Sequence, residues 1–127
     1  MSYSNYHIGD TLIRIKNACL AGYDEVKVTN TKSVRSVLDV LKREGFVESV
    51  SGVKNEIEVK LKRKKGSLGI NDIILVSTPG RRIYIANSDV KSRHGIATLI
   101  LSTPKGMKSG REAIKLGLGG ELIAEVT

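Results

Sequence analysis

Apolar and charged residues alternate without exception from residue 56 to residue 62. Ile57, Val59 and Leu61 fall on one side of an extended chain, and Glu56, Glu58, Lys60 and Lys62 fall on the other. The pattern predicts a strand with one buried face and one wet face. We therefore expect Glu56 and Glu58 to be solvated partners of neighbouring lysines and not a catalytic acid/base pair.

Two amphipathic helices are predicted before this strand. The first has an apolar face of Ile8, Leu12, Ile15 and Cys19, and Arg14 and Lys16 are turned away from that face. The second begins at Thr31 or Lys32, carries an apolar stripe of Val34, Val37, Leu38 and Leu41, and stops at Gly45. Short strands at residues 26–28 and from Phe46 complete this half.

The second half is predicted to consist mainly of short strands, at residues 73–77, 82–85, 96–102 and 121–126. Pro79 and Gly80 suit a type II turn between the first two. Ser109 and Glu112 form a capping box that opens one short helix, and Gly117 closes it.

A polar, glycine-containing connector at residues 64–69 marks the expected domain boundary. The predicted fold class is α+β. An N-terminal α/β domain, residues 1–65, has two helices on a small sheet, and a mostly β C-terminal domain, residues 66–127, has one short helix.

Positive charge is concentrated in two places along the chain. Lysine and arginine number 21 against 13 acidic residues, and residues 81–115 alone hold 8 basic and 2 acidic residues. A second cluster consists of Lys60, Lys62, Arg63, Lys64 and Lys65. A solvated, solubilising surface is the ordinary interpretation of such runs. Two separate clusters on a chain of pI 9.7 favour a polyanionic partner instead.

The stretch Ser102, Thr103, Pro104, Lys105 and Gly106 lies between a predicted strand and the predicted helix at Ser109. It combines small hydroxyls, a cation and a glycine, and a helix start beside Lys105, Lys108 and Arg111 attracts anions. We expect it to contact phosphates and base edges. The alternatives are a plain connecting turn, or an anion site at residues 102–109 of a small phosphoryl-handling enzyme.

Tyr84 is the only aromatic residue after Phe46. Alternation places Arg82 and Tyr84 on one face of their strand, opposite Ile83 and Ile85. An exposed tyrosine beside a cation can stack on an unpaired base. The alternative is a tyrosine half-buried at a domain junction.

Catalysis and metal binding find little support in the sequence. His7 and His94 are the only histidines, and Cys19 is the only cysteine and lies on an apolar helix face. We predict no catalytic residue, no metal and no cofactor. The sequence shows no signal peptide, transit peptide or membrane-spanning run, so we expect no membrane association and a cytoplasmic protein.

Ordered motifs along nearly the whole chain resemble bacterial-type small-subunit ribosomal protein eight. They comprise residues 10–17, 41–46, 78–84, 95–97, 102–106, 111–113 and 116–122. The resemblance implies a structural, non-enzymatic constituent of the small ribosomal subunit. It also implies a primary binder of a helix in the central domain of small-subunit ribosomal RNA that helps to assemble the platform.

The resemblance places RNA contacts at residues 102–106 and at Gly119, Gly120 and Glu121. Pro104 departs from the family's usual serine and lacks a hydroxyl and a backbone donor. Further RNA-binding candidates are Arg14, Lys16, Arg82, Tyr84, Lys108 and Arg111.

The resemblance also implies ribosomal proteins five and twelve as neighbours and, in some family members, binding to their own messenger RNA. We expect the cytoplasmic ribosome rather than an organellar one. A DNA-architectural protein is a further alternative. Competition between ribosomal RNA and duplex DNA for the protein would distinguish this alternative from an RNA-binding protein.

Overall fold

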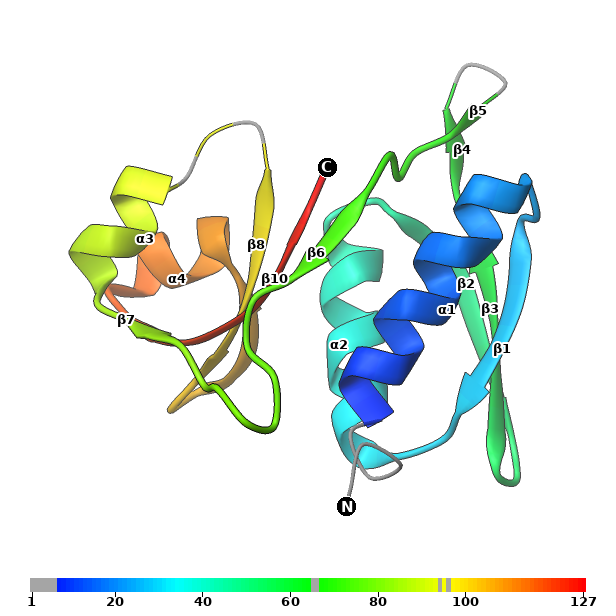
Figure 1. The fold of residues 1–127 in the computed structure, drawn as a ribbon, viewed down its shortest axis with the longest axis horizontal. Helices are drawn as coiled ribbons and strands as arrows, with labels where there is room; N and C mark the ends of the chain where they lie inside the picture. The colour runs from blue at the N-terminus through cyan, green and yellow to red at the C-terminus, as the bar shows by residue number, and fades with distance from the viewer. Residues whose placement is uncertain (1–6, 65–66, 94, 96) are drawn as a thin grey trace. The chain divides into compact units, whose positions relative to one another are not determined.

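The computed structural model describes residues 7–64, 67–93, 95 and 97–127. It divides the chain into two compact units, Met1–Asn71 and Asp72–Thr127, which are shown in Figure 1. The predicted domain boundary falls between residues 65 and 66, and both lie outside the described residues. The fold class is α+β, as the sequence predicted.

Where the structure describes it, the first unit contains two helices and a three-stranded antiparallel sheet. Its elements are α1 His7–Ala21, β1 Glu25–Thr29, α2 Lys32–Arg43, β2 Val47–Val53 and β3 Glu56–Leu61. The strand order is β1-β3-β2. Helix α1 packs against β1 and helix α2 against β2 (Figure 1). Two-residue strands β4, Arg63–Lys64, and β5, Ser67–Leu68, form a small ribbon that overlaps the predicted connector at residues 64–69.

Burial in the first unit follows the sequence pattern. Along β3, Ile57, Val59 and Leu61 are buried and the residues between them are exposed, which confirms the predicted wet face. The predicted stripe on α2 is also buried. On α1, Leu12 and Ile15 are fully buried, whereas Cys19 is only half-buried.

Both ends of α2 form where their capping residues predict. The Thr31 hydroxyl accepts a hydrogen bond from the Val34 amide at 3.2 Å. At the other end Gly45 has φ +86°, and the amides of Gly45 and Phe46 donate to the carbonyls of Lys42 and Leu41. This pair of bonds satisfies carbonyls that the helix itself leaves free, and glycine is favoured there because its φ is positive.

The described residues of the second unit form five strands and two short helices. The strands are β6 Ile73–Leu75, β7 Tyr84–Ile85, β8 Thr98–Thr103, β9 Gly106–Ser109 and β10 Gly120–Val126. They run in the order β6-β10-β8-β9, and β7 also pairs with β10. The helices are α3 Asn87–Arg93 and α4 Gly110–Leu116. A core cluster of Val90, Leu99, Leu101, Ala113 and Leu122 joins both helices to β8 and β10.

Three details of the second unit differ from the predictions. Strand β9 separates the 102–106 stretch from helix α4, so that stretch is the turn of a β-hairpin and not a strand-to-helix turn. Helix α3 is a second helix, which the sequence did not predict. Val90 is the one buried residue among its described residues, so the helix has no periodic apolar pattern. Gly80 has no positive φ, so the turn closed by the Thr78–Arg81 bonds is not type II.

Candidate nucleic-acid interface

The turn of the β8–β9 hairpin is held by one side chain. The Thr103 hydroxyl donates to the Gly106 carbonyl at 2.7 Å and accepts from the Lys105 amide at 3.2 Å. Gly106 has φ +103°, a conformation that glycine adopts without strain. The hydroxyl of Thr103 is therefore used inside the turn, and Pro104, Lys105 and Gly106 form its exposed tip.

Three of the predicted contact residues lie in one row across the sheet. Tyr84 on β7 is paired with Glu121 on β10, and Glu121 is paired with Ser102 on β8. The row continues to Met107 on β9. Directly opposed residues on neighbouring strands share a face of the sheet. We call Tyr84, Glu121, Ser102 and Met107 the sheet row, and the basic tip of the hairpin adjoins it.

Tyr84 is the most exposed member of the sheet row. Its side chain is 70% exposed, which agrees with the predicted outward direction. The buried leucines of β8 and β10 occupy the alternate positions, where they meet helices α3 and α4. The sheet row therefore lies on the face of the sheet opposite these helices.

Glu121 is paired with a cation that also belongs to the predicted site. Arg82 Nη1 lies 3.1 Å from Glu121 Oε2, and the Glu121 side chain is only 13% exposed. Because the Arg82 side chain is 45% exposed, solvent screens the pair, which adds about 0 to 1 kcal/mol to stability, so its value lies mainly in placement. It fixes the carboxylate within the sheet row and reduces the repulsion that a lone carboxylate would exert on phosphate.

Gly119 and Gly120 allow two backbones to approach closely. A Cβ on Gly119 would collide with the carbonyl oxygen of Ile85, and one on Gly120 would collide with the carbonyl oxygen of Ser102. No side chain can fit at either position without moving a strand. The geometry assigns these glycines to strand packing, and through it they align Glu121 with Ser102.

Lys108 and Arg111 lie away from the sheet row. They line a groove of about 300 Å³ with Lys115, Glu112 and Leu116. Lys108 is paired with the buried Leu101, and its direction alternates with that of Met107. The structure therefore places these cations on the helix side of the hairpin. Lys115 was not singled out from the sequence.

Arg14 and Lys16 belong to α1 in the first unit. Arg14 Nε lies 3.0 Å from Asp10 Oδ2, so its charge is locally balanced, and Lys16 is half-buried. The structure does not place either residue in the group formed by the sheet row and hairpin tip.

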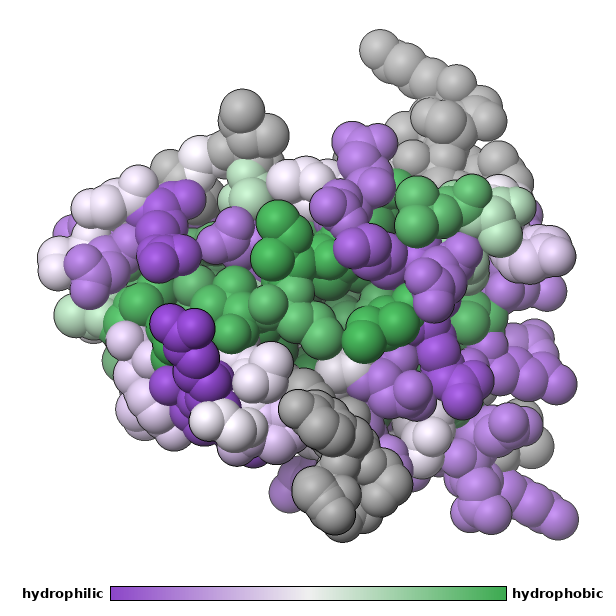
Figure 2. All heavy atoms as spheres, viewed as in Figure 1, coloured by the Kyte–Doolittle hydropathy of each residue, from purple (hydrophilic) through white to green (hydrophobic). Residues whose placement is uncertain are grey.

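The outer face of the first unit's sheet is electrically balanced. Glu25 is paired with Lys60, and Lys27 with Glu58, across β1 and β3. Hydrophilic side chains crowd the right-hand edge of Figure 2, over these strands. Alternating signs make this face a weak phosphate binder, although Lys60 is part of the basic run. Lys65 lies outside the described residues.

The start of helix α4 is fully capped. Ser109 Oγ accepts from the Glu112 amide at 3.2 Å, and Glu112 Oε1 accepts from the Ser109 amide at 2.9 Å, which confirms the predicted capping box. Gly117 has φ +70° and ends the helix as predicted. The capping box already uses the Glu112 amide at the helix start, and strand β9 separates the helix from the hairpin tip. Residues 102–109 therefore do not form the single anion-binding turn that the sequence predicted.

Replacing Ser109 by alanine is expected to lower the free energy of unfolding by about 0.5 to 2 kcal/mol, because a buried N-cap acceptor is lost. Urea unfolding measures this change. Ser92→Ala, on the exposed side of α3, is the control and should change stability by less than about 0.5 kcal/mol. Equal effects of the two substitutions would show that the capping box does not stabilise the unit.

Ser77 is a positioning residue that was not predicted from the sequence. Its hydroxyl is fully buried, donates to the Leu122 carbonyl at 2.7 Å and accepts from the Ile83 amide at 2.9 Å. These bonds tie the chain after β6 to the segment that carries Tyr84. No local pattern marks this serine, because both partners are distant in sequence or across a turn.

Chemistry other than binding has little basis in the described residues. Burial raises the pKa of the Cys19 thiol, so this cysteine is a poor nucleophile. Within residues 7–64, 67–93, 95 and 97–127, no three His, Cys, Asp or Glu side chains are grouped to hold a metal. His94 lies outside this part.

No helix among those described is both long and apolar enough to span a bilayer.

Comparisons with known proteins agree with one another. The family model described as ribosomal protein S8 matches residues 6–127. Small ribosomal subunit protein uS8 of Nitratidesulfovibrio vulgaris (strain DSM 19637 / Miyazaki F) is 41% identical over 120 residues, covering 94% of this chain and 95% of that protein. The uS8 proteins of Leptospira biflexa and Campylobacter hominis are 43% and 40% identical over 125 residues, with the same coverage.

Proposed function

The chain belongs to the ribosomal protein S8 family, and on that basis we propose that it binds ribosomal RNA through the sheet row and hairpin tip of its second unit. Its relatives are small-subunit ribosomal proteins, so it is a structural constituent of the small ribosomal subunit and not an enzyme. It associates there with small-subunit ribosomal RNA and ribosomal proteins. The proposal concerns which residues make the RNA contact.

The finer proposal is that the chain is a primary binder of a helix in the central domain of small-subunit ribosomal RNA and helps to assemble the platform. The observation that carries it is the sheet row, which brings Tyr84, Glu121 and Ser102 from three strands onto one face of the sheet. A flat row of polar and aromatic groups suits the wide, shallow minor groove of RNA or unpaired bases within a helix. A deep major groove would need a protruding helix or ribbon.

The aromatic, polar and charged residues of the site each have a role that follows from their chemistry. Tyr84 offers an exposed ring on which a base can stack. The Ser102 hydroxyl can both donate to and accept from a ribose hydroxyl, and the Glu121 carboxylate accepts from base amino groups. Lys105 at the hairpin tip neutralises a phosphate. Arg82 contributes by holding Glu121 in place.

Pro104 is compatible with this role. Thr103 holds the turn through the amide of residue 105 and the carbonyl of residue 106, so the missing amide of Pro104 removes none of these bonds. Relative to a serine, one hydroxyl and one backbone N–H that could contact RNA are lost. Lys108 and Arg111, on the helix side of the hairpin, supply further positive charge near the bound RNA.

The proposed setting is the bacterial cytoplasm, within the assembled ribosome. Ribosomal proteins five and twelve are the proposed neighbours, and the chain's own messenger RNA is a proposed second RNA partner. Arg14 and Lys16 are proposed as RNA contacts of the first unit. These four proposals follow from family resemblance and charge alone.

Salt dependence tests the electrostatic part of the proposal. The logarithm of the association constant for the central-domain RNA helix should fall linearly with the logarithm of salt concentration, by about 0.7 to 0.9 per phosphate neutralised. Lys105→Ala should reduce this slope by up to about one unit. Lys60→Ala, a cation opposite Glu25 on the balanced face, is the matched control and should leave the slope unchanged.

Filter binding at several salt concentrations gives the slopes, and duplex DNA serves as a competitor. Salt-independent binding would contradict the phosphate contacts. Equal competition by duplex DNA would instead favour the DNA-architectural alternative. Cosedimentation of the untagged protein with small ribosomal subunits tests its place in the particle.

A further inference from the structure

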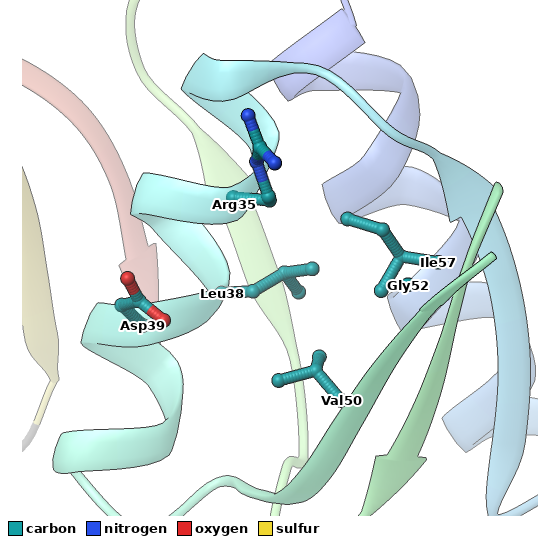
Figure 3. A pocket seen from close by; sticks show the side chains of 6 residues that line it. All are labelled: Arg35, Leu38, Asp39, Val50, Gly52 and Ile57. Atoms are coloured by element: carbon teal, nitrogen blue, oxygen red, sulfur yellow. The ribbon is translucent and has the colours of Figure 1, made fainter. Parts of the chain in front are cut away.

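A small apolar pocket opens between α2 and the β2–β3 hairpin in the first unit. Its volume is about 200 Å³, and its lining residues are Arg35, Leu38, Asp39, Val50, Gly52 and Ile57. Figure 3 shows Leu38 pointing from α2 towards the strands, with Arg35 and Asp39 at the helix side of the opening. The sheet row and hairpin tip lie in the other unit, so this pocket is a separate feature.

The pocket exists because an inward-facing position has no side chain. Gly52 is paired with the buried Ile57, two residues from Val50, which is paired with the buried Val59. Position 52 therefore faces the helices, and the alternation of apolar and polar residues along β2 predicts an apolar residue there. Its φ is not positive, and an added Cβ would meet only Asn30 Nδ2 at 3.6 Å, an ordinary contact. Neither backbone conformation nor close packing requires the glycine.

The pocket also lies on the open edge of the sheet. Among the described residues, β2 is hydrogen-bonded only to β3, so the other side of β2 offers unpaired backbone groups. An open edge of this kind can accept an additional strand. The hairpin is fixed at its tip, because the Asn30 amide donates to the Asn55 carbonyl at 2.8 Å and Asn30 Nδ2 donates to the Lys54 carbonyl at 3.0 Å.

The chemistry of the pocket favours a protein occupant. Its floor of Leu38, Val50 and Ile57 is apolar, and one cation and one anion at its rim cancel, so it does not attract an RNA backbone. Ligand sites for small molecules usually enclose about 300 to 1,000 Å³, and this pocket is smaller. Its volume and apolar floor allow an aliphatic side chain to enter from outside.

The rim charges supply complementarity for the residues beside that side chain. Arg35 and Asp39 are exposed and one helical turn apart, and neither side chain has an ion-pair partner in the part of the chain that the structure describes. A segment with an acidic residue towards Arg35 and a basic residue towards Asp39 would satisfy both. Charges at a rim contribute mainly to the choice of partner and its orientation.

We propose that an extended segment of another small-subunit protein adds as a strand to the free edge of β2 and inserts one aliphatic side chain into the space left by Gly52. An acidic and a basic residue of that segment flank the inserted side chain and meet Arg35 and Asp39. The nature of the partner rests on the proposed function, because membership of the particle makes its proteins the available partners.

Photo-crosslinking with matched variants tests this proposal. A benzophenone side chain replaces Lys42, which is exposed one turn beyond Asp39 and outside the pocket lining. The full chain is irradiated in reconstituted small subunits and, separately, with the purified small-subunit proteins without RNA. Mass spectrometry then identifies the attached segment.

The substitution Gly52→Val places a branched side chain in the pocket, and Ser51→Val places the same side chain on the opposite, exposed face of β2. Circular dichroism and urea unfolding verify that both variants fold. Losing the burial of one aliphatic side chain should lower the yield of the protein crosslink about tenfold in Gly52→Val. The yield in Ser51→Val should stay close to that of the parent chain.

Crosslinks confined to RNA, no protein crosslink in either mixture, or equal yields in the two valine variants would overturn the proposal. In the RNA-free mixture, a protein crosslink cannot depend on RNA binding. Filter binding measures the RNA affinity of the same variants separately. A chain that fails to bind ribosomal RNA but crosslinks to a subunit protein contradicts only the proposed function. A chain that binds RNA normally without the Gly52-dependent crosslink contradicts only this inference.

Discussion

Gly120→Ala is expected to destabilise the second unit by about 3 kcal/mol and to weaken RNA binding at the same time. The added Cβ would collide with the carbonyl oxygen of Ser102, and backbone atoms cannot rotate away as a side chain can. Strands β10 and β8 must separate, and overpacking of this kind costs about 1 to 3 kcal/mol or more. The same movement breaks the alignment of Glu121 with Ser102, and loss of one hydrogen bond worth about 1.4 kcal/mol lowers affinity about tenfold.

Urea unfolding and RNA titration at a temperature where both proteins are folded measure the two effects. Gly80→Ala is the matched control in the same unit, because its Cβ would meet nothing within 4 Å and its φ is not positive. This control should be neutral or should stabilise by up to about 1 kcal/mol. If Gly120→Ala behaved like Gly80→Ala, the close approach of β10 to β8 would be incorrect.

Leu41→Ala is expected to lower the free energy of unfolding by about 2 to 5 kcal/mol, because Leu41 is fully buried beneath α2 and its removal leaves a cavity. The RNA affinity of the folded fraction should stay within about twofold, since the substitution lies outside the proposed site. Lys42→Ala, the exposed neighbour on the same helix, should change stability by less than about 0.5 kcal/mol.

Fluorescence-detected urea unfolding and filter binding provide these values. A large loss of RNA affinity in folded Leu41→Ala would show that the first unit carries a major share of RNA recognition. Arg14 and Lys16 would then be the first residues of that unit to test.

The elements predicted correctly are those whose signals are local in the chain. The alternation along β3, the stripe and caps of α2, and the capping box at Ser109 each involve residues within one element or one turn of it. Their physical causes are side-chain direction and free helix-end groups, which act over a few residues. Such features can be read from a single sequence.

The elements that were missed depend on distant parts of the chain. Strand β9 is four residues long and exists through its pairing with β8. Helix α3 is held through Asn87, whose side chain donates to the carbonyls of Ala113, within α4, and Leu118, just after α4. Tertiary contacts of this kind override weak local propensity, and no window of sequence contains them.

The candidate site shows the same division. The exposure of Tyr84 followed from alternation within its own strand, and the basic tip followed from composition. The sheet row could not be predicted, because it needs the pairing of β7 with β10 and of β10 with β8. The sequence named Thr103 as an RNA contact, but its hydroxyl is engaged in the turn, a use that only the hairpin geometry reveals.

The two bonds of Thr103 also bear on the rate at which RNA would be released. A flexible loop loses conformational entropy when it docks, at a cost of about 0.5 to 1.5 kcal/mol for each immobilised side chain. The turn at residues 103–106 is already ordered in the free protein, so little of the interaction free energy is used to order it on docking. Encounter then resembles the docking of a rigid surface, and RNAs that fit the sheet row differently should differ mainly in how slowly they dissociate.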